Sequence, residues 1–484
     1  MKIAIITDGS VEMGMGHVYR TLSLANELRK FNVNEIIFFT KSDEDVIKKI
    51  EENGFKVIKC SDNNDILKNI KNIKPDVVII DDLGIEEDFA KNIRELCKKL
   101  IFFDNPNPSS NKYADIVVNA IVGSELKNRK YFDEENKTLY FYGPKYLILR
   151  NEFYKVKKEM LSRSKNKETK NILIAFGGSD PSNLTCKVLE ELLSKDRDFN
   201  INVVLGPKFQ YEDELNNLLK RYSKSDKIKI YKNIDNMAEL MKDNDLIITS
   251  PGMTMFEALF LGIPVVVLYQ NELQRECYDD YLKKISKTHL NPLKEGYFID
   301  AEHTDLHIGK GKFEIIEAIT NIYNCKKIGE DSKIIIRQIT DNDLELLMAW
   351  RSNPLIYKFF YIQKEPLKWE EHYSWWMSRE NRVDWIILLR ENNTIRKVGS
   401  VNVSQLNTDN PEIGILIGEF FLWGKHIGRH SVSLVLKWLK NIGYKKAHAR
   451  ILENNIRSIK LFESLGFKKT KKGRENEWIY EVNL

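Results

Sequence analysis

Short apolar runs alternate with helix-compatible stretches along most of this chain, and this alternation limits the fold more than any other feature. In the first half the runs are residues 3–7, 35–40, 56–59, 76–81, 100–103 and 115–118, and in the second half they are residues 172–176, 202–205, 228–231, 245–249 and 264–268. This order is typical of parallel sheets that are covered by helices. We therefore predict an α/β protein with two lobes, and a cleft between such lobes is the natural ligand site.

The pattern changes near residue 324, where the composition turns polar. Beyond this point we expect a helix over residues 341–351 and a mostly antiparallel sheet. The strands of this sheet are residues 334–337, 385–389, 398–403, 412–418, 447–452 and 478–482. A chain of 484 residues is long enough for two or three domains. We place the domains at residues 1–154, 155–325 and 333–484, with the charged residues 155–170 as a hinge helix or linker.

Composition argues against several classes of protein. A net charge of +5, with acidic and basic residues mixed along the chain, does not fit a dedicated nucleic-acid binder. The five cysteines are scattered, which indicates neither a disulfide framework nor a zinc site and fits a reducing cytoplasm. We find no signal peptide and no apolar run of bilayer length, so we expect a cytoplasmic protein without a membrane span. The composition leaves the oligomeric state open.

Gly14-Met15-Gly16-His17 follows the first apolar run and precedes a helix-like segment over residues 18–30. Glycine lets a backbone approach a ligand closely, and a helix N-terminus offers free N–H groups to an anion. A histidine at this position can also exchange a proton near neutral pH. The motif therefore predicts a ligand site at the start of a helix. The alternative is a tight turn with a histidine near the helix start.

Two loops in the second half repeat this arrangement. Gly177-Gly178-Ser179 ends one predicted strand, and residues 250–258 follow another. In the second loop, Gly252 and Thr254 can present N–H and hydroxyl donors to a diphosphate at a helix start. Glu257 lies one turn along the same helix, where it can accept hydrogen bonds from ribose hydroxyls. The alternative is an ordinary capped helix in which Glu257 complements the helix macrodipole.

These motifs carry a resemblance to a known family. Residues 1–320 resemble the PseG family, the UDP-sugar hydrolases of pseudaminic acid biosynthesis. That family has the glycosyltransferase-B architecture of two Rossmann-like lobes and is related to the glycosyltransferase MurG. The matching segments are Gly-x-Gly-His-Val-x-Arg at residues 14–20, residues 143–146 with 149–150, residues 177–181 and residues 252–257.

The PseG resemblance implies hydrolysis of a UDP-linked 2,4-diacetamido-2,4,6-trideoxy sugar at its anomeric carbon, giving UDP and free sugar without a metal. His17 is then the residue that transfers the proton of the attacking water. The diphosphate is expected at Gly252, Met253 and Thr254, and the ribose at Glu257. The other implied substrate-binding residues are Gly14, Gly16, Arg20, Asp81, Gly177, Gly178 and Ser179.

One turn departs from the PseG pattern. The family sequence Asp-His-Tyr-Gly is Asp-Asp-Leu-Gly here, at residues 81–84. The change removes an imidazole and a phenol near the expected sugar, and it leaves the identity and stereochemistry of the sugar open.

The C-terminal unit contains two segments typical of a cofactor site. Residues 423–429, Trp-Gly-Lys-His-Ile-Gly-Arg, lie between a strand and an amphipathic helix, and consecutive backbone N–H groups in such a loop can hold a pyrophosphate. Asn455 and Ser458 begin a later helix that ends at Gly466, and both can hydrogen-bond an extended ligand. The alternative is that Asn455 is only an N-cap and Gly466 only a C-cap.

Residues 333–484 resemble the GNAT acetyltransferases, and segments 350–354 and 372–376 resemble the PseH sugar N-acetyltransferases. The resemblance implies acetyl-CoA as co-substrate. The backbone of residues 414–418 is then expected to align the pantetheine and polarise the thioester carbonyl. The residues implied for acetyl-CoA are Ile415, Ile417, Gly424, Lys425, Ile427, Gly428, Arg429, Asn455 and Ser458.

Two positions depart from the GNAT pattern. His426 stands where the loop usually has glycine, and Phe462 stands where many relatives have a tyrosine that protonates the departing thiolate. That proton would here come from water or from another side chain. Glu412 and His372 are candidate bases for the amine, and both are also compatible with structural roles.

Together the two resemblances predict a bifunctional enzyme of pseudaminic, or nonulosonic, acid biosynthesis. It would N-acetylate a UDP-4-amino-4,6-dideoxy sugar and then hydrolyse the UDP-linked product. Two alternatives stay open: a UDP-sugar glycosyltransferase, and a non-catalytic sugar-nucleotide binder suggested by the altered turn at residues 81–84. The acetyltransferase could also act on another amine, and a cleft lined by aromatics such as Trp375 and Trp376 would favour a sugar.

Overall fold

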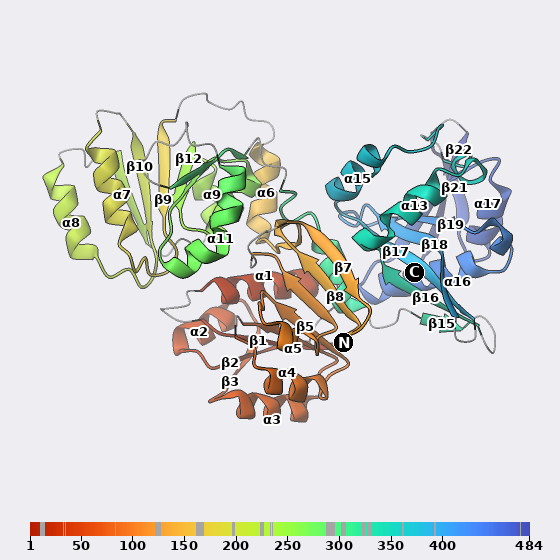
Figure 1. Cartoon of the computed structure of the whole chain (residues 1–484), viewed down its shortest axis with the longest axis horizontal. Coiled ribbons are helices and arrows are strands. Elements are labelled where there is room, and N and C mark those ends of the chain that lie inside the picture. Colours follow the sequence, from red (N-terminus) through yellow and green to blue (C-terminus); the bar gives the residue numbers. More distant parts are fainter. Residues whose placement is uncertain are drawn as a thin grey trace.

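Three sheets, each with its own helices, make up the protein (Figure 1). The computed structural model describes residues 1–9, 15–31, 33, 35–82, 84–121, 127–160, 169–195, 199–222, 227–232, 234, 236–286, 296–301, 306–321, 325–327, 332–360, 363–391, 394–474 and 476–484. In Figure 1 the first lobe lies below and between the second lobe on the left and the C-terminal domain on the right. The order of elements confirms the predicted α/β class, with two Rossmann-like lobes followed by a mostly antiparallel domain.

The first lobe is built on an eight-stranded sheet in the order β3-β2-β1-β4-β5-β6-β8-β7. Its strands are β1 (Lys2–Thr7), β2 (Glu35–Thr40), β3 (Lys56–Lys59), β4 (Val77–Asp81), β5 (Lys99–Phe103), β6 (Ile116–Asn119), β7 (Arg129–Asp133) and β8 (Thr138–Tyr142), and its helices are α1 (Gly16–Lys30), α2 (Glu44–Glu52), α3 (Asn63–Ile73), α4 (Glu87–Arg94) and α5 (Pro108–Asn111). Neighbouring strands are parallel except in the hairpin of β7 and β8. Every residue of β4 is buried, as expected where helices cover both faces of a parallel sheet.

The second lobe has six strands in the order β11-β10-β9-β12-β13-β14, and only β14 is antiparallel to its neighbour. Its strands are β9 (Asn171–Ala175), β10 (Asn200–Leu205), β11 (Ile228–Lys232), β12 (Leu246–Thr249), β13 (Val265–Val267) and β14 (Tyr297–Ile299), and its helices are α6 (Asn151–Met160), α7 (Leu184–Leu193), α8 (Glu212–Arg221), α9 (Met237–Met241), α10 (Met253–Leu261) and α11 (Glu272–Ile285). Helix α6 covers the first part of the predicted hinge, and residues 161–168 lie outside the described residues.

The C-terminal domain has eight strands in the order β15-β16-β17-β18-β19-β20-β22-β21. Its strands are β15 (Cys325–Lys327), β16 (Ser332–Gln338), β17 (Val383–Glu391), β18 (Thr394–Ser404), β19 (Glu412–Ile417), β20 (Lys446–Leu452), β21 (Lys468–Lys472) and β22 (Glu477–Asn483), and its helices are α13 (Leu344–Arg351), α14 (Pro354–Tyr357), α15 (Trp369–Ser378), α16 (Ile427–Asn441) and α17 (Ile456–Glu463). The sheet is antiparallel except where β19 meets β20. Among the helices that the structure describes, none is long and apolar enough to cross a membrane.

Five strands were not predicted from the sequence: β7, β8, β14, β15 and β21. Strand β21, for example, reads Lys-Lys-Thr-Lys-Lys, and all five residues are exposed. It forms the edge of its sheet, where lysines discourage pairing with another chain. The helix predicted over residues 341–351 is a 3₁₀ turn over Asp341–Asp343 followed by α13.

Helix α12 (Lys312–Thr320) joins the first lobe to the C-terminal domain. On the first-lobe side, Lys312 forms an ion pair with Glu27 of α1 at 3.0 Å. On the other side, the Trp385 indole of β17 donates a hydrogen bond to Glu317 at 2.7 Å. Both carboxylates are buried, so α12 belongs to the cores of two domains at once.

Phe31, which follows the last residue of α1, extends this junction. Its ring lies 5.7 Å from the ring of Phe313 on α12 and 6.4 Å from the ring of Tyr444, measured between centroids. Phe31 is part of the same apolar cluster as the core residues of the C-terminal domain. The first lobe therefore contributes a side chain directly to the core of the C-terminal domain.

A buried ion cluster around Glu314 completes the junction. Glu314 of α12 contacts Lys130 of β7, Arg379 at 3.3 Å and Lys145 at 3.8 Å, and none of the four side chains is more than 3% exposed. Burial alone would raise the pKa of Glu314, but the charges of Lys130, Arg379 and Lys145 outweigh burial and lower this pKa to about 2. Glu314 is thus an ionised carboxylate that neutralises cations from two domains.

Replacing this carboxylate by an amide is expected to destabilise the junction. Glu314→Gln leaves buried cations without their partner, and we expect the free energy of unfolding to fall by about 3–5 kcal/mol. Urea titration followed by tryptophan fluorescence can measure the loss, because Trp385 lies at the junction. The stabilisation by Glu314 is expected to be complete above its ordinary pKa of 4.5 and to be lost as the pH falls toward about 2.

Glu190→Gln is the matched control, since Glu190 pairs with Arg221 at 2.7 Å on the surface of the second lobe. We expect this variant to change stability by less than about 1 kcal/mol. Equal losses from the two variants would contradict the importance of the buried cluster.

Candidate functional site

The start of α1 places a histidine on the carboxylate at the end of β4. Strands β1 and β4 are parallel neighbours, and Thr7 is paired with Asp81, so the helix that follows β1 begins beside Asp81. His17 Nδ1 lies 2.6 Å from Asp81 Oδ1. Arg20, one turn later, donates from Nε to Asp81 Oδ2 at 2.8 Å and also contacts Asp104.

The charge of Asp81 determines the state of His17. Burial alone would raise the pKa of Asp81, but the nearby Arg20 and His17 outweigh burial and lower this pKa to about 2. An ionised carboxylate can only accept hydrogen bonds, so the proton between the two side chains is on His17 Nδ1. In a neutral imidazole the other nitrogen, Nε2, then keeps its lone pair. The His17 side chain is 13% exposed, so part of the imidazole reaches the surface of the described residues.

Besides His17, four residues of the first lobe were predicted to bind the substrate: Gly14, Gly16, Arg20 and Asp81. The structure describes the last three. Gly16 is exposed as the first residue of α1, and a Cβ built on it would meet no atom within 4 Å. Asp81 and Arg20 are buried and bonded to each other. They therefore lie beneath His17, and direct contact between either side chain and a substrate stays a prediction.

Two positions of the predicted motifs, Gly14 and Leu83, lie outside the described residues. In the altered turn that contains Leu83, the Asp82 carboxylate accepts a hydrogen bond from the backbone N–H of Gly84 at 3.1 Å. The carboxylate that replaces the family's imidazole thus bonds to the backbone of its own turn.

The predicted diphosphate loop opens at the start of α10. Gly252 precedes the helix with a φ of 143°, a conformation that favours glycine. A Cβ at this position would meet no atom within 4 Å. Met253 and Thr254 are half-buried in the first turn, where backbone N–H groups have no acceptor within the helix. The helix start therefore offers hydrogen-bond donors to an open space.

The other glycine loop, residues 177–179, packs closely against Gly206. A Cβ on Gly206 would come within 2.2 Å of the Gly177 carbonyl oxygen. Asp180, the next residue, caps α7, because its carboxylate accepts from the N–H groups of Leu184 at 2.9 Å and Thr185 at 2.8 Å. Asp180 is thus a helix cap, and substrate contacts of Gly177, Gly178 and Ser179 stay predictions.

Glu257, the residue predicted to bind the ribose, is paired with Arg150, which lies between the last strand of the first lobe and α6. Arg150 Nη2 lies 3.2 Å from Glu257 Oε1. Burial raises the pKa of Glu257, and the charge of Arg150 lowers it only in part. Arg150 itself precedes α6, and it was noticed in the sequence only as part of a family segment.

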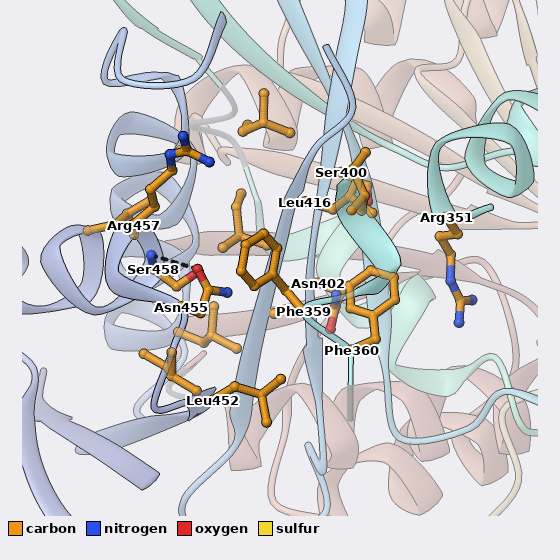
Figure 2. A pocket seen from close by; sticks show the side chains of 18 of the residues that line it. Arg351, Phe359, Phe360, Ser400, Asn402, Leu416, Leu452, Asn455, Arg457 and Ser458 are labelled. Atoms are coloured by element: carbon orange, nitrogen blue, oxygen red, sulfur yellow. Dashed lines mark hydrogen bonds between the residues drawn. The ribbon is translucent and has the colours of Figure 1, made fainter. Parts of the chain in front are cut away.

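A cavity of 1520 Å³ opens in the C-terminal domain where β19 and β20 separate (Figure 2). These strands are paired in parallel at Glu412 and His448, and the remainder of β19 and the end of β20 line the cavity. In Figure 2, Asn455 and Ser458 lie on one side of the cavity and Arg351 lies on the other. Diverging strands leave backbone groups unpaired along both edges, where an extended ligand can bind them.

Most of the residues predicted to bind acetyl-CoA line the cavity. Those that line it are Ile415, Ile417, Gly424, Ile427, Gly428, Arg429, Asn455 and Ser458. Lys425 is exposed and is not among the lining residues. Asn455 Oδ1 also accepts a hydrogen bond from the N–H of Ser458 at 3.2 Å, so Asn455 caps α17 as well.

The loop before α16 has the backbone that the GNAT pattern requires. His426 has a φ of 60°, in the left-handed region that favours glycine, which accounts for the usual glycine at this position. Gly428 packs closely against α17, because a Cβ there would come within 2.6 Å of Leu461 Cδ1. The start of α16 therefore lies close to α17 and faces the cavity.

Part of the cavity lining is aromatic and cationic. Phe359, Phe360 and Arg351 line the cavity (Figure 2). Trp375 lines it as well, and the guanidinium carbon of Arg351 lies 4.8 Å from the centre of the Trp375 ring. No carboxylate forms an ion pair with Arg351 within the described ranges. Trp376 was expected beside Trp375, but it is buried at the domain junction, where its ring lies over the Arg379 guanidinium. No periodicity or motif in the sequence indicated the two phenylalanines.

The two candidate bases lie in different surroundings. Glu412 lines the cavity, and its carboxylate accepts from Arg450 Nε at 3.0 Å and from Gln405 at 2.8 Å. His372 is buried away from the cavity lining, and burial lowers its pKa to about 4. Phe462 lines the cavity and packs against Phe467, with 4.9 Å between ring centroids.

Among the described residues, no three His, Cys, Asp or Glu side chains are grouped so that they could hold a metal ion.

Two segments of the chain match models of known protein families. Residues 172–278 match the glycosyltransferase family 28 C-terminal domain, and residues 333–468 match the acetyltransferase (GNAT) domain. An N-acetyltransferase 9-like protein of Caenorhabditis briggsae is 33% identical over 119 residues, which are 22% of this chain and 60% of that protein.

Two bacterial relatives align with the lobed part. The spore coat polysaccharide biosynthesis protein SpsG of Bacillus subtilis is 32% identical over 280 residues, which are 57% of this chain and 79% of SpsG. The UDP-2,4-diacetamido-2,4,6-trideoxy-beta-L-altropyranose hydrolase of Campylobacter jejuni is 27% identical over 268 residues, which are 54% of this chain and 89% of the hydrolase. The chain therefore belongs to the family of SpsG, and it carries a GNAT acetyltransferase domain at its C-terminal end.

Proposed function

We propose that this protein performs two consecutive steps on a sugar nucleotide of nonulosonic acid biosynthesis. The GNAT domain acetylates the 4-amine of a UDP-4-amino-4,6-dideoxy sugar that already carries an acetamido group at carbon 2, and the lobed part hydrolyses the UDP-linked 2,4-diacetamido-2,4,6-trideoxy product. The observation that carries the proposal is the His17–Asp81 pair at the start of α1. The similarity to the Campylobacter jejuni hydrolase supports the same substrate class.

In the proposed hydrolysis, His17 is the general base. Its Nδ1–H is held by ionised Asp81, and its Nε2 takes a proton from water. The water oxygen then bonds to the anomeric carbon as the bond from that carbon to the UDP oxygen breaks. UDP leaves with the bonding electron pair, and backbone N–H groups at the start of α10, in place of a metal, stabilise its diphosphate.

In the proposed acetyl transfer, the pyrophosphate of acetyl-CoA lies at the start of α16 and its pantetheine lies along β19. The sugar amine attacks the thioester carbon, the nitrogen loses one proton and the carbon–sulfur bond breaks. The sulfur takes up one proton, so that CoA leaves as the thiol. Arg351 supports a sugar nucleotide as acceptor, because a cation without a described carboxylate partner can bind a phosphate. The aromatic rings of Phe359, Phe360 and Trp375 can pack against a sugar or a base.

A glycosyltransferase is the second candidate, because the second lobe matches a glycosyltransferase domain. The two activities differ in their product. A hydrolase releases free sugar when water is the only acceptor, whereas a transferase consumes the UDP-sugar slowly until its acceptor is added.

A single assay separates these possibilities. The protein is mixed with the UDP-linked 4-amino sugar, with and without acetyl-CoA, and the release of thiol and of UDP is followed. We expect thiol first, then UDP and free diacetamido sugar. Thiol without UDP would reject the hydrolase, and no thiol with any UDP-linked amino sugar would reject the acetyltransferase assignment.

Loss of the His17 imidazole is expected to stop only the second step. With the diacetamido UDP-sugar supplied directly, His17→Gln should lower the rate of UDP release by about 100-fold or more, the usual contribution of a general base. Asp81→Asn should also lower this rate, because the amide cannot hold the same imidazole tautomer. UDP release can be measured by a coupled enzyme assay.

Thiol release provides the internal control, since His17→Gln should leave acetyl transfer intact. His307→Asn is a matched control on a remote histidine, and asparagine tolerates its φ of 49°. Full UDP release by His17→Gln would rule out the role proposed for this residue.

Arg429 provides a test of the cofactor position. It is an exposed cation at the start of α16 that lines the cavity. Arg429→Met should raise the KM for acetyl-CoA about tenfold and leave kcat nearly unchanged, because a charge-assisted contact to the bound cofactor is lost. Steady-state thiol release measures both constants. Lys440→Met, at the exposed last turn of the same helix, should change neither, and equal effects of the two variants would refute the assignment.

A further inference from the structure

Arg150 connects the two halves of the proposed UDP-sugar site. It lies in the segment between the first lobe and α6, and its side chain reaches Glu257 on α10. Nε and Nη2 of Arg150 both donate to Glu257 Oε1, at 3.3 and 3.2 Å. On the first-lobe side, the Arg150 guanidinium carbon lies 5.8 Å from the centre of the Tyr19 ring, two residues after His17. One side chain therefore contacts both the helix that carries His17 and the helix that begins at Gly252.

The two oxygens of the Glu257 carboxylate are used unequally. Both hydrogen bonds from Arg150 end on Oε1. Within the part of the chain that the structure describes, no donor reaches Oε2. A carboxylate has about four lone-pair positions over its two oxygens, so Oε2 keeps the capacity to accept two hydrogen bonds from a ligand.

Burial makes the charge of Glu257 depend on Arg150. The Glu257 side chain is 6% exposed, and burial is the main cause that raises its pKa. Among described groups, the charged neighbours that shift this pKa are Arg150, which lowers it, and Glu152, which raises it. Glu152 also forms an ion pair with Arg150 at 3.1 Å. Tyr19 is the titratable group on the other side of Arg150.

We propose that Arg150 is a positioning residue of the nucleotide site, which holds Glu257 Oε1 so that Oε2 is presented to the ribose hydroxyls of UDP. The inference rests on the proposed UDP site, and it adds a residue outside that site's own lobe. Ribose hydroxyls donate well to a carboxylate, whereas a protonated carboxyl has lost part of its acceptor capacity. Arg150 therefore acts through Glu257.

The pH dependence of UDP binding tests this role. Binding of UDP, and of its 2′,3′-dideoxy analogue, is measured by calorimetry on the full chain from about pH 8 to about pH 5.5, a range in which a buried carboxyl can titrate. The loss of UDP affinity from the alkaline to the acidic end should be about tenfold larger for Arg150→Met than for wild type, because burial raises the pKa of Glu257 and this pKa rises further when the Arg150 cation is removed. Arg150→Lys should restore most of the affinity.

Two further measurements separate positioning from direct contact. In a Glu257→Gln background, Arg150→Met should have little additional effect on UDP, and the dideoxy analogue should show little dependence on either residue. Arg221→Met, which removes an exposed arginine of the second lobe, is the matched control and should bind UDP like wild type.

The outcomes are distinct. If Arg150→Met weakens UDP equally at every pH, or equally in the Glu257→Gln background, Arg150 contacts the nucleotide directly and the inference is overturned. A second outcome is that wild type binds UDP while every variant keeps the wild-type ratio of affinities for UDP and for the dideoxy analogue. In that case the inference fails, and the proposed UDP site stands. If wild type does not bind UDP at all, the proposed UDP site itself fails.

Discussion

The carboxylate of Glu314 holds this architecture together. A charge removed from water is costly unless an opposite charge lies beside it, and here Lys130 and Lys145 come from the first lobe while Arg379 comes from the C-terminal domain. None of these cations keeps its buried partner if the domains separate. The lobed part and the acetyltransferase domain are therefore one packed body along α12, and the cavity between β19 and β20 has a fixed place relative to α1.

Most of the fold could be predicted from the sequence, and the exceptions have a physical cause. A parallel strand buried on both faces, such as β4, must be apolar throughout and is conspicuous. An edge strand such as β21 needs no apolar residue, because its backbone pairs on one side and its lysines face water. The double role of α12 was also hidden, since a helix buried in two cores has the same apolar composition as a helix buried in one.

In the candidate sites, residues in local sequence motifs could be predicted, whereas contacts that depend on the fold could not. His17 could be found because its motif is local, lying between a strand and a helix. Its partner Asp81 was assigned to the substrate, and only the pairing of β1 with β4 shows that it lies beneath His17. The phenylalanines of the acetyltransferase cavity have no local signal at all. Trp376 shows the converse, since adjacent tryptophans on a helix point in different directions and only Trp375 reaches the cavity.

Helix α1 spans the distance between the candidate site of the first lobe and the acetyltransferase domain. Its first turn carries His17, and Phe31, just past its last turn, is embedded in the core of the acetyltransferase domain. Fifteen residues of α-helix form a rod of about 22 Å. Helix α1 therefore fixes the spacing between His17 and the core of the acetyltransferase domain.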